Sequence, residues 1–273
     1  MARILAAMSL TTPTIDTDLR YVQRGSGPDV LLVAGLSDPA EAWQAQLDGL
    51  ADRYRVTAFD NRGSGRSPLP DGPLTVVSMA EDAAALLRAL GIERAHVAGF
   101  SGGGLIAQEL ALRHPEVVRT LVLNGTYATV DEHLRRMILS WRRLAAASPD
   151  ARTFLEDFLV WIYTPAAHAD GTVDAIIDEV LGDPHPQSVE AFQRQCDAFL
   201  GHDALDRLHA ITAPTLVLSG ELDLACPPRL GRAIAERIPG AEHVVLRGAA
   251  HQPFQEDPQG WNARVDAFWS WTR

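Results

Sequence analysis

Short apolar runs that alternate with amphipathic segments constrain the fold of this chain more than any other feature. The runs follow turn residues and predict strands, at 18–23, 29–35, 55–60, 96–99, 120–125, 215–220 and 243–248. The later runs are almost continuously apolar, as in strands that are buried on both faces of a parallel sheet. Amphipathic segments predict helices between or after them, at 78–91, 104–115, 228–240 and 261–271. This order predicts an α/β fold with a doubly wound sheet.

One long region breaks this alternation. Residues 127–213 carry no strand signal, and we expect helical segments there, at 131–148, 151–164, 172–182 and 188–201. A region of that size between two strands is too long for a loop. We therefore predict a helical cap inserted at 127–213, over a core that is formed by residues 1–126 and 214–273.

A serine among glycines marks the turn between the strand at 96–99 and the helix that follows it. Gly99-Phe100-Ser101-Gly102-Gly103 matches G-x-S-x-G in that context, so Ser101 is expected on a tight strand-to-helix turn. Glycines at 99 and 103 avoid Cβ clashes in such a turn. A plain turn with small residues for packing is the structural alternative, and the context favours a nucleophile.

A serine hydroxyl is a weak nucleophile and needs a base and an orienting acid. On this type of fold the order along the chain is Ser, then Asp or Glu, then His, each in a loop after a strand. Of the nine histidines, His251 alone combines that order with that position. Glu221 and Asp223 both follow the strand at 215–220. We choose Asp223, because Glu221 is nearer the strand.

Two backbone N–H groups are candidates for an oxyanion hole. The Gly102 N–H follows Ser101 at a helix N-terminus, which adds positive potential. The Leu36 N–H lies in the loop after the strand at 29–35 and is the second candidate.

These residues lie in blocks that resemble the α/β-hydrolase superfamily over nearly the whole chain. The blocks occur in the usual order, and they are VAGLSDPAEAW, FDNRGSGRS, GFSGGG, APTLVLSGELD and AAHQPFQEDP. The resemblance implies a mostly parallel, eight-stranded sheet with a cap, and Ser101, Asp223 and His251 as the catalytic triad. Small capped esterases and lactonases, including enol-lactonases, are the most similar group. Ala34 departs from the pattern, because relatives usually carry His before the oxyanion glycine.

The expected reaction is hydrolysis of a carboxylic ester or lactone through an acyl-enzyme, without metal or cofactor. A carbon–carbon bond hydrolase or a perhydrolase on the same triad, and a non-catalytic ligand receptor, remain alternatives. We expect a small to medium, largely apolar substrate, because no Arg or Lys adjoins the triad motifs. The expected pocket residues are Leu36, Phe100, Trp141, Phe158 and Trp161. Packing of the cap onto the sheet is the alternative for each aromatic residue.

Composition excludes several partner classes. The formal charge of -11 disfavours nucleic acid, and no apolar run approaches the length that spans a bilayer. Two cysteines cannot build a disulfide framework, so a reducing compartment is expected. The N-terminal MARILAAMSLTTPT is weak as a signal peptide, and we expect a cytoplasmic protein that acts on a small molecule. The sequence does not decide whether the protein forms a homo-oligomer.

Overall fold

The computed structural model describes residues 18–271, so the N-terminal MARILAAMSLTTPT lies outside the described residues. Seven strands form one sheet with the order β1-β3-β2-β4-β5-β6-β7. They are β1 (Tyr21–Arg24), β2 (Asp29–Val33), β3 (Arg55–Phe59), β4 (Ala95–Phe100), β5 (Val118–Asn124), β6 (Thr215–Gly220) and β7 (Glu242–Leu246). Only β1 pairs antiparallel with its neighbour, β3. Residues 18–271 thus supply seven strands of the doubly wound sheet rather than the eight that the family resemblance implied.

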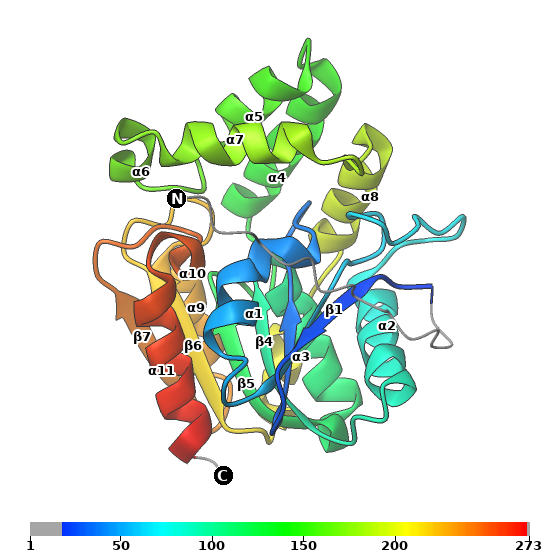
Figure 1. The fold of residues 1–273 in the computed structure, drawn as a ribbon, viewed down its shortest axis with the longest axis vertical. Coiled ribbons are helices and arrows are strands. Elements are labelled where there is room, and N and C mark those ends of the chain that lie inside the picture. The colour runs from blue at the N-terminus through cyan, green and yellow to red at the C-terminus, as the bar shows by residue number, and fades with distance from the viewer. Residues whose placement is uncertain (1–17, 272–273) are drawn as a thin grey trace, which may run out of the picture.

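Two helical layers cover the sheet (Figure 1). On one face lie α2 (Val76–Ala89), α3 (Gly102–Arg113) and α9 (Pro228–Ala235). On the other lie α1 (Gln44–Gly49), α10 (Pro253–Glu256) and α11 (Pro258–Trp271). Strand side chains alternate between these layers, so that Leu31 and Val33 face the first and Val30 and Leu32 the second. Short 3-10 turns span Ala40–Trp43, Pro115–Val117 and Leu205–Ala210.

Five helices separate β5 from β6 and are called the insertion below. They are α4 (Glu132–Ala147), α5 (Ala151–Leu159), α6 (Pro165–Ala169), α7 (Thr172–Gly182) and α8 (Val189–Leu200). Side-chain caps start several of them: Asp131, Asp150 and Ser188 accept from N–H groups of the first turns of α4, α5 and α8. Figure 1 shows α4 to α7 above the sheet, with α8 beside them.

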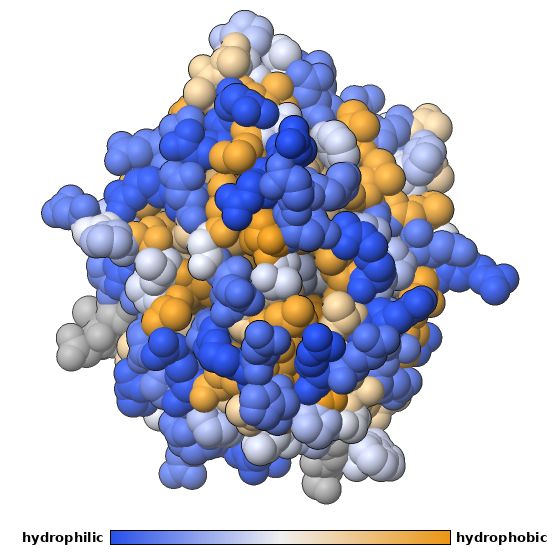
Figure 2. Space-filling view, turned by 180° about the vertical axis from the view of Figure 1, so that it is seen from behind, coloured by the Kyte–Doolittle hydropathy of each residue, from blue (hydrophilic) through white to orange (hydrophobic). Residues whose placement is uncertain are grey.

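The outer surface is mixed in character. On the face drawn in Figure 2, apolar side chains occur in patches between polar and charged ones. Among residues 18–271, none of the helices has both the length and the apolar character to span a membrane.

Candidate active site

Ser101 lies on a sharp turn between β4 and α3. Its backbone has φ 51° and ψ -119°, which is a strained conformation for a residue with a Cβ. The turn leaves no room beside it: a Cβ on Gly99 would collide with the Gly103 carbonyl oxygen, and one on Gly103 with the Val33 carbonyl oxygen. Gly104, which the turn motif does not require, packs its α-carbon against the Thr126 side chain. The three glycines therefore bring strand and helix into close contact around the serine.

The structure brings Ser101, His251 and Asp223 together into one chain of hydrogen bonds. His251 Nε2 lies 3.0 Å from Ser101 Oγ, and His251 Nδ1 lies 2.8 Å from Asp223 Oδ2. Asp223 and His251 are buried, and Ser101 is half-buried. This arrangement can transfer the Ser101 proton to His251, while the carboxylate stabilises the imidazolium.

Further contacts fix the two partners of Ser101. The second oxygen of Asp223, Oδ1, accepts the Cys226 N–H at 2.7 Å. The backbone N–H of His251 donates to the Ile162 carbonyl oxygen at 3.0 Å, which connects the loop that carries His251 to the insertion. Glu221, the alternative acid, is exposed and accepts the Gly248 N–H at 2.8 Å.

Gly125 is a site residue that the sequence reasoning missed. It follows β5 with φ 52°, and a Cβ there would lie 3.2 Å from His251 Nδ1 and 3.3 Å from Asp223 Oδ2. A side chain at this position would crowd the His251–Asp223 hydrogen bond. A glycine directly after a strand, next to Asn124, was the available signal. Asn124 itself accepts the Trp261 indole N–H at 3.1 Å.

The loop after β2 reaches the same place. Leu36 and Gly102 line one cavity together with Ser101. The loop backbone is held from outside, since Asn61 Nδ2 donates to the Ala34 carbonyl oxygen at 2.8 Å. Ser37 has φ 72°, again in the left-handed region. The Asn61 side chain thus supports this loop from Ala34, next to the strained backbone of Ser37.

The cavity over Ser101 is small and apolar. Its volume is about 20 Å³, room for little more than one water molecule. The lining residues carry no ionised side chain, and they are Leu36, Ser101, Gly102, Tyr127, Met137, Ile138, Trp141, Phe199, Ala225 and Cys226. Of the expected pocket residues, the structure places Leu36 and Trp141 here.

The other three expected pocket residues do not line this cavity. Phe100 points into the layer that contains α1, α10 and α11. Its ring centroid lies 4.7 Å from that of His251 and 4.9 Å from that of Phe254. Phe158 packs inside the insertion, 5.1 Å from Trp141. Trp161 lies 6.4 Å from Trp141 and is 36% exposed. Phe100 lies on the other side of the sheet because successive residues of a strand alternate, and the two insertion aromatics pack around Trp141 rather than over Ser101.

A further carboxyl, that of Asp38, lies beside the site. The Gly35 N–H and the Gln252 amide donate to it, and His251 lies close enough to interact electrostatically. Desolvation nevertheless outweighs these contacts and raises the pKa of Asp38 to about 7. The group therefore changes charge near neutral pH.

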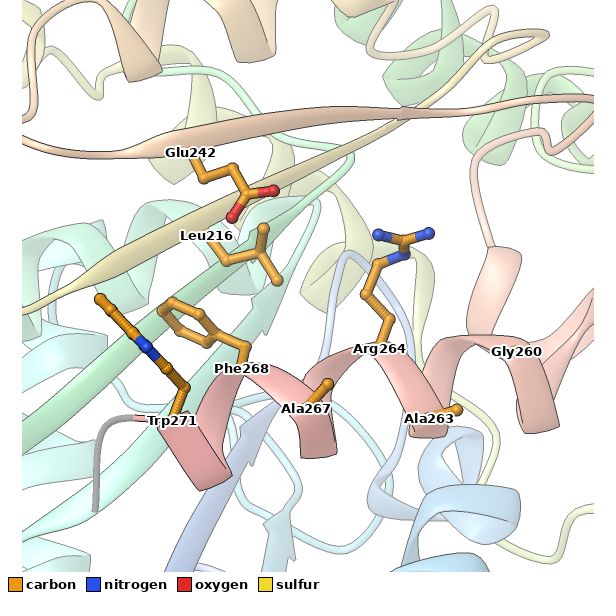
Figure 3. A pocket seen from close by; sticks show the side chains of 8 residues that line it. All are labelled: Leu216, Glu242, Gly260, Ala263, Arg264, Ala267, Phe268 and Trp271. Atoms are coloured by element: carbon orange, nitrogen blue, oxygen red, sulfur yellow. The ribbon is translucent and has the colours of Figure 1, made fainter.

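A second hollow lies far from Ser101. This groove of about 620 Å³ is formed by α11 and the first residues of β6 and β7, with Leu216, Glu242, Arg264, Phe268 and Trp271 among its lining (Figure 3). Ser101 lies at the opposite, carboxyl end of the strands, where ligands of open α/β sheets bind. Within residues 18–271, no group of three or more His, Cys, Asp or Glu could hold a metal ion.

The chain and its fold are similar to several known proteins. The chain is 34% identical over 254 residues to "Putative carbamate hydrolase RutD" of Azorhizobium caulinodans, and the match covers 93% of this chain and 95% of that protein. The structure resembles the enol-lactonase of Burkholderia xenovorans with a TM-score of 0.84 and 28% identity, over 92% of this chain and 96% of the other. It also resembles a thermophilic esterase of Thermogutta terrifontis, with a TM-score of 0.82 and 26% identity over 93% of each chain.

A family match identifies the chain more broadly. The sequence pattern of the alpha/beta hydrolase fold matches residues 28–258, which include Ser101, Asp223 and His251. The chain therefore belongs to the α/β hydrolase fold family.

Proposed function

We propose that the protein is a serine hydrolase that cleaves a carboxylic ester or lactone through an acyl-enzyme. The observation that carries the proposal is the continuous hydrogen-bond chain from Asp223 through His251 to Ser101. Ser101 is the nucleophile, His251 the general base and Asp223 the residue that orients the imidazole. The reaction uses water and needs neither a metal nor an organic cofactor.

The proposed reaction has two halves. Ser101 Oγ attacks the carbonyl carbon while its proton passes to His251 Nε2, and the N–H groups of Leu36 and Gly102 stabilise the oxyanion. Collapse of this intermediate expels the leaving alcohol, which takes the proton from His251. Water activated by His251 then releases the acid and frees Ser101.

The cavity supports a small, uncharged acyl group. Its lining is apolar and its volume is about 20 Å³, so even a short acyl group needs a small shift of the lining side chains to enter, and a long chain needs a larger shift of the insertion. Arg229, the cation nearest to Asp223 in sequence, forms an ion pair with Asp131 at 2.6 Å. We propose short-chain uncharged esters or lactones as substrates, in preference to anionic ones. The two free, buried cysteines fit a cytoplasmic location.

Carbamate hydrolysis is the second candidate. The relative of Azorhizobium caulinodans carries that activity in its name and is similar over almost its whole length. A carbamate ester presents a carbonyl with one nitrogen substituent, and attack by Ser101 would break the ester bond, expel the alcohol and give a carbamoyl-enzyme that water then hydrolyses. The lining of the cavity carries no ionised side chain, which suits an uncharged carbamate ester.

A substrate panel tests the proposal. We expect kcat/KM to fall from p-nitrophenyl acetate to butyrate to octanoate, and neutral lactones to be cleaved faster than an anionic enol-lactone. A p-nitrophenyl carbamate belongs in the panel, and preference for it over the acetate favours the second candidate. A preference for the enol-lactone would contradict the uncharged pocket. Cleavage of a ring-cleavage dienoate alone would replace ester hydrolysis with carbon–carbon bond hydrolysis.

A further inference from the structure

Helix α8 of the insertion contacts the oxyanion loop through a buried glutamine. The Ser37 N–H donates to Gln195 Oε1 at 3.1 Å, across 158 positions in sequence. Gln195 is fully buried, so this acceptor is desolvated. Ser37 directly follows Leu36 and holds a left-handed backbone with φ 72°.

The same glutamine is anchored to the core on its other side. Its Nε2 donates to the Arg62 carbonyl oxygen at 2.9 Å and to Ser64 Oγ at 3.0 Å. These residues belong to the turn after β3, where Asp60 accepts the Ala40 N–H at 2.7 Å. Gln195 therefore bridges two loops of the core from a helix of the insertion.

Gln187, just before α8, supports this bridge. Its Nε2 donates to Gln195 Oε1 at 3.1 Å and to the Gly63 carbonyl oxygen at 2.9 Å. Gln187 is half-buried, whereas Gln195 is buried, so Gln187 is the more tolerant of the two positions.

The next turn of α8 meets the other side of the proposed oxyanion hole. Phe199 is four residues after Gln195, so the two side chains lie on one face of the helix. The Phe199 ring covers Gly102 so closely that a Cβ on Gly102 would collide with it. One helix face thus contacts both the Leu36–Ser37 loop and Gly102.

We propose that Gln195 is a positioning residue that holds the Leu36–Ser37 backbone in the conformation that the oxyanion hole requires, so that helix α8 completes the hole. The inference depends on the proposed serine hydrolase function. Gln195 is not among the residues that line the cavity over Ser101. It acts through the Ser37 N–H and fixes a loop whose backbone is strained at Ser37.

The test uses Gln195→Met, which keeps the side-chain length and removes the acceptor. Gln193→Met is the matched control, because Gln193 lies on the same helix and donates only within the insertion, to the Arg142 carbonyl oxygen at 3.2 Å. Gln195→Met should lower kcat for p-nitrophenyl acetate by about 10- to 100-fold, less than the loss of an oxyanion donor itself, and change KM by at most about twofold. Gln193→Met should leave both values near those of the wild type.

Two ketones separate positioning from general damage. Benzyl trifluoromethyl ketone takes up the Ser101 oxygen at its carbonyl carbon, the proton passes to His251, and the carbonyl oxygen becomes an oxyanion. Benzyl methyl ketone binds without this step. Gln195→Met should weaken the first ketone by the same factor as kcat and leave the second unchanged. Equal weakening of both ketones, or an unchanged kcat, would overturn the inference.

Two further variants test the inference if Gln195→Met does not fold. Gln195→Glu keeps an oxygen acceptor for the Ser37 N–H but loses the donor to the Arg62 carbonyl oxygen, so it should recover part of the affinity for the trifluoromethyl ketone that Gln195→Met loses. Gln187→Met leaves the Gln195–Ser37 hydrogen bond in place and removes the hydrogen bonds from Gln187 to Gln195 and to the Gly63 carbonyl oxygen, so it should give a smaller loss of the same kind, about threefold. If neither variant follows this pattern, the inference is wrong.

The amide exchange of Ser37 separates this inference from the proposed function. Hydrogen exchange at the Ser37 N–H should be faster in Gln195→Met than in Gln193→Met. Wild-type protein that cleaves no ester and does not distinguish the two ketones would refute the hydrolase. If the wild type is active, and Gln195→Met changes neither its kcat nor the exchange rate of the Ser37 N–H, the positioning role alone is refuted.

Discussion

Two acids follow the same strand two positions apart, and their surroundings differ at the scale of single residues. Asp223 is buried, and its oxygens accept from His251 Nδ1 and the Cys226 N–H. Glu221 is exposed and accepts the Gly248 N–H. A carboxylate that must stabilise an imidazolium is most effective where water is excluded, so Asp223 is the better orienting group.

The first prediction compares these two acids. Asp223→Asn should keep the fold, because an amide fits the same volume, and lower kcat by about 10⁴-fold, because an amide does not hold the imidazole in the tautomer that accepts the Ser101 proton. Glu221→Gln should change kcat little. Steady-state kinetics with p-nitrophenyl acetate measure both, and circular dichroism checks folding. A near-normal rate in Asp223→Asn with a large loss in Glu221→Gln would reverse the assignment.

Local signals predict some site residues and not others. Ser101, Asp223 and His251 each follow a strand-like run, so their common edge of the sheet can be read from the sequence. Leu36 lines the cavity as expected. Phe100 does not, because adjacency to Ser101 in sequence places it on the opposite side of the strand.

Long-range contacts account for what the sequence could not reveal. Gln195 meets Ser37 across 158 positions, and such a pairing depends on how α8 is seated on the core. The role of Gly125 follows from the positions of His251 and Asp223, which come from two other strands.

At the scale of elements, the predicted strands and longer helices agree with the structure to within a few residues at their ends. Helix α2 shows why the ends differ. Ser78 was expected near its start, but Thr75 is the N-cap, and Thr75 and Ser78 form a reciprocal capping box. The short helices α1 and α6 carry too few turns to give a periodic pattern, so packing rather than local sequence defines them.

Helix α4 supplies the second prediction, since Trp141 on it lines the cavity. Trp141→Ala should open the cavity and raise kcat/KM for p-nitrophenyl octanoate relative to the acetate, by about tenfold or more. Trp161→Ala is the control, because Trp161 lies outside the cavity and is partly exposed. The ratio of the two kcat/KM values is the measurement. Equal shifts in both variants would mean that Trp141 does not limit the acyl chain.

At the scale of the whole molecule, Asp38 links the site to the stability of the fold. Its pKa is raised from 3.8 to about 7 in the folded protein. Between these values folding takes up a proton, so the free energy of unfolding falls as the pH rises. The contribution is present below pH 3.8 and is lost as the pH passes about 7.

The third prediction concerns a variant that lacks the titrating carboxyl of Asp38. The Asp38→Asn side chain does not ionise, so the free energy of unfolding of this variant does not fall as the wild-type value does. The difference between variant and wild type should therefore shift in favour of the variant by roughly 2–4 kcal/mol between about pH 4.5 and about pH 8, at ~1.4 kcal/mol per pKa unit. Urea unfolding at both pH values measures the difference. Buried His202, whose pKa is lowered to about 4, titrates in both proteins and cancels. A difference that does not vary with pH would show that Asp38 keeps an ordinary pKa.

The central claim is that Ser101, activated by His251, forms a covalent acyl-enzyme. Acid-quenched samples taken during turnover of p-nitrophenyl acetate can be weighed by intact-protein mass spectrometry and mapped by peptide digestion. The account predicts one acetyl group, located on Ser101 in the wild type and absent from Ser101→Ala. An acetyl group on another residue, or turnover that survives in Ser101→Ala, would contradict it.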